Sequence, residues 1–582
     1  TYDNAGPEAY GISLQTSSKD NNIVNNTISF CGSGGIAIVT NSSNNTILSN
    51  TIFNSTEAGK GIFLVSGACN NSIVNNTIYN TNYSIHVQKD RGGWAGLPSI
   101  KSNNNTIDNN TIYHNIDHGL ILEYSDNNTI SNNIINNTTN GYGVYLYYSN
   151  YTNFTDNSVY NNSDAGIDLD GSCNNTLSSN FVYNNENDGI RLSSSSNNSL
   201  FENYIYDNLD KGVQLNSAEN NIIYHNNIYG NNNQNGFDDS QGNNTWYNDT
   251  YHEGNYWGDY PGVDSNNDGI GNTEYTVTTM GGTDNNDSYP LINKYGSIKN
   301  IDTDEVFLTI QNAIDDTNTL NGHTLSIDNG TYRENIILDK ELTLTNTSGA
   351  TSIITGTGGY GINVTANNTF IQNISVTNCS SGLGIYVFNS THPLENITLE
   401  NITIDDANLG VGVDNATYFN ITDSTIFNCP MGGILLGYRE QVLGLSGYCT
   451  NCNLSFNTVR DVNSGIFIRN SSDNEIYDNR IYNAGIGIVV WYSNNSNNLS
   501  SNQVYNNSDK GIWFYNSDHN NISSNHVYNN TAGIKLESSS NNNNLTENTV
   551  GNNTNYGIYF HTCSNNTIAN NTVNTNLNHG IY

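Results

Sequence analysis

Oxygen-bearing side chains alternate in the stretch DSNNDGIGNTE, residues 264–274. The spacing Asp-x-Asn-x-Asp-Gly is the first half of a calcium loop, in which alternate oxygens converge on the ion and the glycine allows a sharp turn. The twelfth position holds Tyr275 instead of an acid, and the acid Glu274 stands one place early. Two interpretations therefore stay open, a calcium site and an asparagine-rich turn that holds no ion. The calcium ligands would be Asp264, Asn266, Asp268, Ile270 through its carbonyl, Asn272 and Glu274.

Cleavage of a polysaccharide needs two carboxylates that face one groove. The adjacent pairs Asp238–Asp239 and Asp315–Asp316 do not meet this need, because neighbouring side chains of a strand point to opposite faces. Asp168 and Asp170 are two apart and can share a face, but no His or Arg partner recurs at the matching position of nearby repeats. We therefore expect no catalytic residues and a protein that is not an enzyme.

Two tripeptides, Asp117-His118-Gly119 and Asn578-His579-Gly580, are faintly similar to a polygalacturonase signature. The carboxylates and the Arg-x-Lys that accompany this signature are absent from the chain. Both histidines stand where other repeats carry Lys or Tyr. We interpret them as exposed variation of the repeat.

The chain has eight cysteines, among them the pair Cys449 and Cys452 in a CxxC spacing. A single CxxC without a second pair is a weak zinc signal. In a protein outside the cell, a disulfide is the better interpretation, either within this pair or to Cys429. The connectivity stays open.

Acceptor sites for N-linked glycans, Asn-x-Ser/Thr, recur through most of the chain. The alternative is that the repeat needs Asn-Asn-Thr for its turns, whether or not a sugar is attached. If the second Asn of each pair points inward, the acceptor beside it faces solvent. The predicted glycosylation sites are Asn25, Asn44, Asn70, Asn75, Asn104, Asn109, Asn127, Asn161, Asn174, Asn506 and Asn529.

An internal repeat must position all these residues. The apolar residue that follows Asn-Asn-Thr/Ser recurs every 23 or 24 positions, and a disordered tract would not hold such a register. In the first half it falls at Ile107, Ile130, Phe154, Leu177, Leu200, Ile223 and Trp246, and in the second half at Ile476, Leu499, Ile522, Leu545 and Ile568.

Each repeat has three short apolar marks bounded by Asn, Ser and Gly. In residues 174–196 these are Leu177, Phe181–Val182 and Ile190–Leu192, each too short for a helix. Three strands and three turns in 23 residues form one coil of a solenoid, whose strands pair in parallel with the next coil. The fold class is therefore all-β, a parallel β-helix, and the crossover rule makes it right-handed.

The recurrent Asn and Gly have separate expected roles. The second Asn of each triplet would form a hydrogen-bonded ladder between coils; examples are Asn45, Asn105, Asn128 and Asn175. The Gly before the third strand, as at Gly166 and Gly189, would supply a turn that only glycine makes at low cost. A Tyr often follows the second strand, as at Tyr160 and Tyr183. This outward stripe either binds glycans or a neighbouring subunit, or packs along its own sheet.

The repeat is interrupted once, which divides the chain. We expect one β-helix over residues 1–237, an irregular closing segment over 238–296, a capping segment over 297–324 and a second β-helix over 325–582. In the capping segment Phe307, Ile310, Ala313, Ile314 and Thr317 have helical spacing, so a short amphipathic helix would cover the open end of the second solenoid. Enlarged coils at residues 88–102 and 437–452 predict two long loops.

The passages TIQNAI, NGHTLSIDNGTYRENIIL and ELTLT resemble the opening of NosD-type, PbH1-repeat β-helix proteins of the carbohydrate-binding and sugar-hydrolase kind. The passage GNYWGDYPGVDSNNDGIGNTEYTV resembles the segment that closes such helices in archaeal surface proteins. The NosD name implies copper, but with two Met and scattered His we expect no copper site. Calcium is the one cofactor that the sequence suggests.

Composition limits the partners. Acidic residues outnumber basic ones 53 to 17, and a net charge of −36 disfavours nucleic acid and anionic membranes. No apolar run approaches the roughly 20 residues needed to cross a bilayer. The chain begins without a signal segment and stops within a repeat, so we expect a slice of a longer chain or ends that stack on neighbours.

These features predict an extracellular structural protein that self-associates into a homopolymer, such as a cell-surface layer, sheath or filament. One alternative is a β-helix that binds or modifies polysaccharides. Another is an adhesin that uses the two long loops, with surface glycans as partners. This fold hosts many functions, so the fold does not choose among them.

Overall fold

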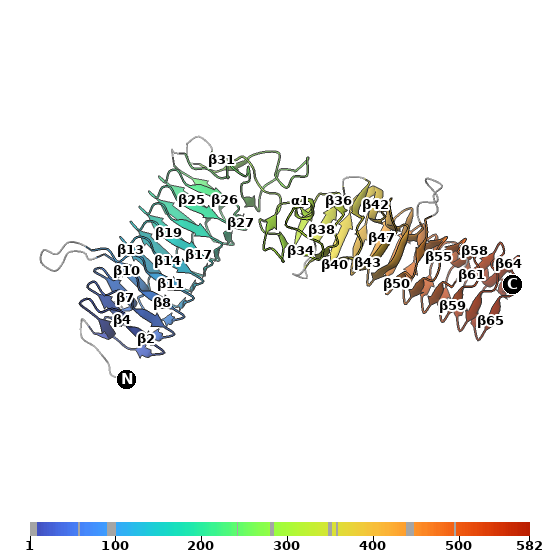
Figure 1. Cartoon of the computed structure of the whole chain (residues 1–582), viewed down its shortest axis with the longest axis horizontal. Coiled ribbons are helices and arrows are strands. Elements are labelled where there is room, and N and C mark those ends of the chain that lie inside the picture. Colours follow the sequence, from blue (N-terminus) through green and yellow to red (C-terminus); the bar gives the residue numbers. More distant parts are fainter. Residues whose placement is uncertain are drawn as a thin grey trace. The chain divides into compact units, whose positions relative to one another are not determined.

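The computed structural model describes residues 9–55, 59–89, 100–240, 243–279, 285–346, 352–356, 359–437, 447–493 and 496–582. These residues form two compact units, Thr1–Tyr295 and Gly296–Tyr582. Each unit is a right-handed parallel β-helix, as predicted (Figure 1). The closing segment therefore belongs with the first unit and the capping segment with the second.

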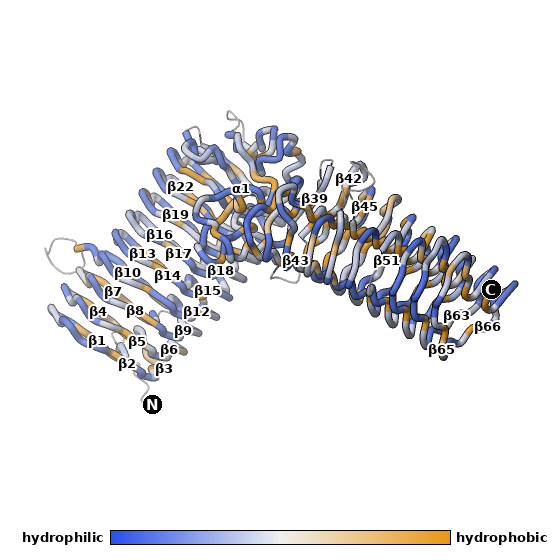
Figure 2. Tube along the Cα trace, turned by 45° about the vertical axis from the view of Figure 1, so that its right-hand side comes forward, coloured by the Kyte–Doolittle hydropathy of each residue, from blue (hydrophilic) through white to orange (hydrophobic). Residues whose placement is uncertain are grey.

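One coil shows how the sequence folds. Strands β20 (Thr176–Ser178), β21 (Phe181–Tyr183) and β22 (Ile190–Ser193) each turn one or two apolar side chains inward. Leu177, Val182 and Ile190 are fully buried. Stacking places each of them on its equivalent in the next coil, so the apolar positions line the interior of each solenoid (Figure 2).

The corners of the coil are made by residues in the left-handed conformation. Asn174 (φ 58°), Ser179 (φ 56°) and Asn184 (φ 53°) each stand immediately before a buried asparagine. Asn tolerates this backbone better than most residues because its short side chain bonds locally. Asparagine is the most frequent residue at these left-handed turns in the described part of the chain.

The buried asparagines form the predicted ladder. Asn175 Nδ2 donates to Asn198 Oδ1 of the next coil at 3.1 Å. Two further ladders were not predicted: Asn180 Nδ2 donates to Asn203 Oδ1 at 2.9 Å, and Asn185 Nδ2 to Asn208 Oδ1 at 2.9 Å. All three corners of the coil are therefore held by side-chain amides as well as by the backbone.

Our explanation for the recurrent glycines is wrong. Gly166 does not have a positive φ. A Cβ there would lie 2.6 Å from Val182 Cγ1 and 2.9 Å from the Gly189 carbonyl oxygen, closer than real Cβ contacts. Glycine is needed because the backbone at this position approaches a core side chain and the backbone of the next coil too closely for any side chain.

The first unit has three parallel sheets among its described residues. The first sheet runs from β2 (Asn22–Val24) to β26 (Ile222–Tyr224), and the second from β3 (Thr27–Ser29) through β27 (Asn227–Tyr229) to β29 (Tyr256–Trp257). The third sheet consists of β1 (Tyr10–Leu14), β4 (Gly34–Val39), β7 (Lys60–Val65), β10 (Tyr83–Gln88), β13 (Leu120–Glu123), β16 (Val144–Tyr147), β19 (Ile167–Asp170), β22, β25 (Lys211–Asn216) and β28 (Gln234–Asp238).

The closing segment covers the last coil of the first unit. Trp246 and Trp257 are buried there, with ring centroids 5.5 Å apart. Strands β30 (Tyr275–Val277) and β31 (Asn285–Asp287) pair in an antiparallel hairpin. The segment thereby closes an apolar core that would otherwise end in an open sheet edge.

The second unit opens with the predicted helix. Helix α1 (Ile310–Asp315) buries Ile310, Ala313 and Ile314. It is shorter than expected, because Phe307 belongs to strand β33 (Val306–Phe307), which pairs antiparallel with β32 (Ile298–Asn300). Thr309 caps the helix, and the Glu334 carboxylate accepts the first two backbone N–H groups at 2.9 Å each.

The remaining strands of the second unit form three sheets in the described residues. They run from β34 (Thr324–Ile327) to β65 (Thr567–Ala569), from β35 (Gly330–Tyr332) to β66 (Thr572–Asn574), and from β36 (Ile336–Leu338) to β67 (His579–Ile581). The central parts of the two predicted long loops lie outside the described residues.

Candidate functional site

The outer face of the third sheet of the first unit carries a row of polar and aromatic side chains. In β19 the side chains of Ile167 and Leu169 point into the core. Asp168 and Asp170 therefore share the outer face, as expected. Parallel pairing then fixes their neighbours in the strands on either side. The column that contains Asp168 reads Tyr145, Asp168, Arg191, Gln214 and Phe237, one residue from each of β16, β19, β22, β25 and β28.

This column corrects the expectation that Asp168 has no cationic neighbour. Arg191 pairs in register with Asp168, one coil further along. The interval is 23 residues, so adding one period to Asp168 would have found Arg191. We missed it because the column is not a repeated motif, and each coil places a different residue type there.

Arg191 is bound by carboxylates. Its Nε donates to Asp188 Oδ2 at 2.8 Å, and its Nη2 lies 3.4 Å from Asp164 Oδ1. Asp188 is fully buried and also lies 3.9 Å from Lys211 Nζ, which bonds to Asp210 at 2.7 Å. Each of the two cations on this part of the face is thus held by two aspartates.

Asp168 is nearly buried, with 4% of its surface exposed. Burial raises the pKa of its carboxyl to about 7, against the opposing effect of Arg191. The side chain bonds with Tyr142, but its Oδ1 has no hydrogen-bond partner among the described residues. A buried acceptor without a partner is uncommon and suggests a site for a ligand or water.

Three aromatic rings, those of Tyr145, Tyr142 and His118, belong to this part of the face. Tyr145 donates its hydroxyl to Asp170 Oδ2 at 3.3 Å. The His118 ring stacks on Tyr142 with centroids 5.1 Å apart. Burial raises the pKa of Tyr142 to about 12, so its phenol is a donor at neutral pH, and burial lowers the pKa of His118. Our interpretation of His118 as exposed variation is therefore wrong, whereas His579 is exposed.

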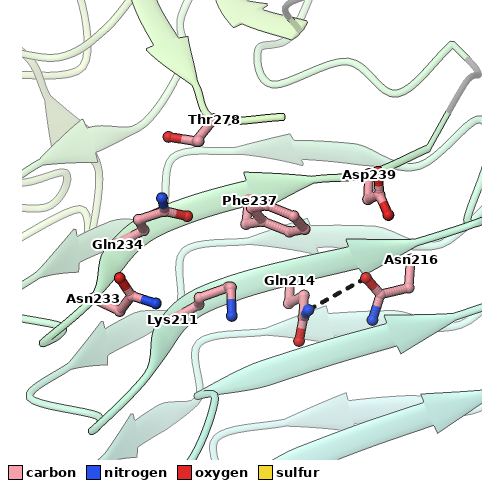
Figure 3. Close-up of a pocket in the computed structure, with 8 residues that line it drawn as sticks. All are labelled: Lys211, Gln214, Asn216, Asn233, Gln234, Phe237, Asp239 and Thr278. Carbon is pink, nitrogen blue, oxygen red and sulfur yellow. Dashed lines mark hydrogen bonds between the residues drawn. The ribbon is translucent and has the colours of Figure 1, made fainter. Parts of the chain in front are cut away.

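A cavity of about 390 Å³ adjoins the column at β25 and β28. Side-chain amides line much of it, and so does Thr278 of the closing segment, which forms a parallel bridge with Phe237 beside β28 (Figure 3). The Phe237 ring lies among them, with Lys211 Nζ 5.3 Å from its centroid. The amides are Gln214, Asn216, Asn233 and Gln234. Gln214 Nε2 donates to Asn216 Oδ1 at 3.2 Å, and Gln234 Oε1 is buried without a partner among the described residues.

The adjacent acid pairs do not form a groove. Asp238 is fully buried and accepts a hydrogen bond from Asn244 at 3.0 Å, while Asp239 lines the cavity. Asp315 is the last residue of α1, and Asp316 is its C-cap.

The predicted calcium loop is held together by its own side chains. Asp264 Oδ1 accepts a hydrogen bond from the Asn267 N–H at 2.6 Å. Asp264 Oδ2 accepts one from the Gly269 N–H at 2.9 Å. Asn266 bonds to Asp268 at 2.7 Å and to Asn272 at 3.2 Å, and the Ile270 N–H donates to Asp268 at 2.9 Å.

Glu274 does not join this loop. Its carboxylate accepts from Asn286 Nδ2 at 2.7 Å and from Ser288 Oγ at 3.1 Å, at and just after strand β31. Hydrogen bonds of Asp264, Asn266, Asp268 and Asn272 therefore hold the loop, and Glu274 takes no part in it. Calcium binding remains a prediction.

The predicted glycan acceptors share one geometry. All eleven are exposed and have φ between 53° and 58°. The asparagine that follows is inward in the same turns; Asn105, Asn128 and Asn175 are each 1% exposed. The acceptor side chain thus faces solvent while its neighbour holds the ladder. The sites are Asn25, Asn44, Asn70, Asn75, Asn104, Asn109, Asn127, Asn161, Asn174, Asn506 and Asn529.

The three cysteines proposed for a disulfide are free and buried in this structure. Burial raises the pKa of Cys429 to about 11. Burial and contact with Cys449 raise the pKa of Cys452 well above its ordinary value. Such thiols are poor nucleophiles at neutral pH.

The tyrosine stripe packs on itself. The rings of Tyr160, Tyr183, Tyr206 and Tyr229 stack with successive centroids 4.8, 4.9 and 5.1 Å apart. Lys294 Nζ lies 3.7 Å from the Tyr229 centroid at the end of the stack. Because each ring face is covered by the next, the stripe offers ring edges and hydroxyls, and flat stacking of a sugar along it is blocked.

Comparison with known proteins gives the family. A model described as "Right handed beta helix region" matches residues 3–97, 342–497 and 445–573, which together exceed half of the chain. A model described as "Periplasmic copper-binding protein (NosD)" matches residues 92–262. A cell surface glycoprotein of Methanothermus fervidus is 29% identical over 195 residues, which are 33% of this chain and 28% of that protein. The chain thus spans less than a third of this curated relative.

Several solved structures share the fold. The A-module of a mannuronan C-5 epimerase from Azotobacter vinelandii is 15% identical, with a TM-score of 0.36 over 47% of this chain and 94% of that one. A periplasmic alginate epimerase is 14% identical, with a TM-score of 0.30 over 62% and 61%. An alginate lyase from Paenibacillus is 13% identical, with a TM-score of 0.28 over 47% and 95%.

These structures overturn the expectation that the chain is not an enzyme. They are epimerases and a lyase, so a parallel β-helix fold does not by itself exclude an enzyme. At these identities and scores the likeness concerns the fold alone. In the described part of the chain, no helix is both long and apolar enough to cross a membrane.

Proposed function

The chain belongs to the right-handed β-helix family, and from that premise we propose that it is an extracellular protein of a cell surface. Its solenoids would serve as building blocks of a surface layer, sheath or filament, in contact with further copies of the chain. The observation that carries this proposal is the geometry of the eleven glycan acceptors. Each faces solvent, and all but Asn25 stand directly before a buried ladder asparagine, so a glycan can be attached without disturbing the core.

The packing supports a structural role. Every coil is joined to the next by three parallel sheets and by ladders such as Asn175 to Asn198. Such a stack resists local opening because each side-chain amide bonds across the coils at a buried position. The resemblance to a cell surface glycoprotein over 195 residues agrees with this location.

Negative-stain microscopy and glycopeptide mass spectrometry of protein from its native source test the proposal. We expect ordered sheets or filaments, and hexose-bearing peptides at several of the eleven acceptors. Dispersed single particles together with unmodified acceptor peptides would refute it. If ordered assemblies are seen but the acceptors are unmodified, the structural role stands and the proposed glycosylation is refuted.

A second candidate function is binding or modification of a saccharide by the outer face of the third sheet. The observation that favours it is Asp168, a nearly buried carboxyl beside Tyr142 and Arg191, one oxygen of which has no partner among the described residues. Structural asparagine ladders do not need such a group. Titration of the whole chain with oligosaccharides, followed by calorimetry, tests this candidate, and absence of binding to any of them would eliminate it.

A further inference from the structure

We propose that the outer face of the third sheet binds an oligosaccharide that bears an amine, with the ammonium at Asp168 and Asp170 and an adjoining sugar in the cavity beside Phe237. This inference rests on the second candidate function and names its ligand class. It differs from the acidic polymers named for the alginate enzymes above.

The charges of the face exclude an acidic ligand. Arg191 and Lys211 are each held by aspartates, so neither is available to neutralise an incoming carboxylate. A uronate would bring a further negative charge to a protein whose net charge is already −36. The carboxylates that interact with these two cations are Asp164, Asp168, Asp188 and Asp210, and Asp170 interacts with Asp168.

Asp168 is suited to receive an ammonium group. Its Oδ1 is buried and has no donor among the described residues, whereas an ammonium carries three donors. The carboxylate of Asp170 lies on the same face of β19, near the Tyr145 hydroxyl. A cation between them would also approach the rings of Tyr142 and Tyr145, and phenol rings attract cations within about 6 Å of their centroids. Arg191 Cζ already lies 5.9 Å from the Tyr142 centroid.

The cavity is suited to a sugar ring. Its amides Gln214, Asn216, Asn233 and Gln234 offer both donors and acceptors to hydroxyl groups, and Phe237 offers an apolar surface. The Oε1 of Gln234 is a buried acceptor that has no donor among the described residues. Asp168 and Phe237 are three strands apart in one column, about 14 Å at the usual strand spacing. The ligand is therefore an oligosaccharide that lies along the column.

Isothermal titration calorimetry with the full chain tests the inference, with three oligomers of equal length as probes. These are oligoglucosamine, its neutral N-acetylated form and an oligomer of mannuronate. We expect oligoglucosamine to bind best, the neutral oligomer to bind more weakly and the uronate to give no heat. Asp168→Asn should weaken oligoglucosamine binding by roughly 10- to 100-fold, the usual worth of a hydrogen bond to a charged group, and should leave the neutral oligomer unchanged.

Two further variants make the result decisive. Asp170→Asn is a second probe of the ammonium site should Asp168→Asn fail to fold. Asp156→Asn is the matched control, because Asp156 lies exposed at a left-handed turn where the preceding coil has Asn132. Equal or better binding of the uronate, or an unchanged affinity in both site variants, would overturn the inference while leaving a saccharide-binding face. Failure of all three oligomers to bind would instead remove the second candidate function itself.

Discussion

Asp287 accepts a hydrogen bond from the backbone N–H of Asn255 at 2.7 Å and so ends an asparagine ladder of the first unit. The ladder reaches Asn255 through Asn203 and Asn226, whose amides donate from coil to coil at 2.8 and 2.9 Å. The last asparagine of a ladder has a donor with no further asparagine to receive its hydrogen bond. Here a carboxylate is the acceptor. Asp238 ends the neighbouring ladder in the same way, by accepting from Asn244.

Replacement of Asp287 by Ala should destabilise the first unit. The substitution leaves two buried donors unpaired, the Asn255 N–H and the Trp257 indole, and also removes the acceptor of the half-buried Tyr289 N–H. At about 1–3 kcal/mol for each buried unpaired group, the loss is on the order of 3 kcal/mol or more. Urea unfolding monitored by tryptophan fluorescence measures it. Asp287→Asn, which keeps one acceptor oxygen, should lose less unfolding free energy than Asp287→Ala. Equal stability of the Ala variant and the parent would contradict this role.

The stability of the first unit should depend on the titration of Asp168. Burial raises the pKa of this carboxyl to about 7 in the folded chain, above its ordinary value of 3.8. The folded state therefore holds the proton more tightly, and the stability that this contributes is complete below about pH 4 and is lost as the pH rises through 7. The loss is at most on the order of 4 kcal/mol.

Comparison with Asp168→Asn isolates this effect. The unfolding free energy of the parent should fall relative to that of the variant between pH 4 and 8, because Asn does not titrate there. Arg191, Asp164 and Asp170 face the same carboxyl and remain in both proteins. Parallel pH profiles for the two proteins would show that Asp168 does not titrate in this range.

An interior ladder residue and an exposed turn residue should respond differently to substitution. Asn180→Ala removes an amide that donates to the Phe154 carbonyl and to Asn203, and should cost roughly 2–4 kcal/mol. Asn161→Gly changes an exposed residue with φ 54° to one that adopts this conformation freely. This variant should change the free energy of unfolding by no more than about 0.5 kcal/mol. Chemical unfolding of both variants provides the comparison. Similar losses would mean that the ladder adds nothing beyond the backbone.

Calcium should bind the loop through Asp264 and Asp268 without Glu274. Glu274 is held by Asn286 and Ser288, so Glu274→Gln should retain calcium affinity, while Asp268→Asn should lose it. Calorimetric titration of chelator-treated protein with calcium measures both. If the parent releases no heat, the loop is an asparagine-rich turn; if Glu274→Gln also loses binding, the carboxylate rotates into the site.

The thiols of Cys429, Cys449 and Cys452 should react only after unfolding. All three are buried, and burial raises the pKa of Cys429 and of Cys452. A thiol reagent added to the denatured, unreduced protein should count eight thiols per chain, as the structure has them. A count of six would establish one disulfide, and peptide mapping would then show whether it joins Cys449 to Cys452.

The period of the sequence was sufficient to predict the coil. Apolar residues 23 positions apart, such as Leu177 and Leu200, must stack because a single coil cannot bury them. The same period places Asn175 over Asn198 and leaves Asn174 in solvent. These properties belong to each repeat separately, so composition and spacing alone reveal them.

The candidate site was decided by the tertiary structure. Asp168, Arg191 and Gln214 occupy one position in three successive coils, and no local pattern joins them, because they differ in type and are far apart in sequence. The need for Gly166 likewise comes from a side chain and the backbone of the next coil. The burial of Asp287 comes from a closing segment without repeats. Periodic contacts can be read from a sequence because they recur, whereas contacts that occur once need the register and packing of the folded chain.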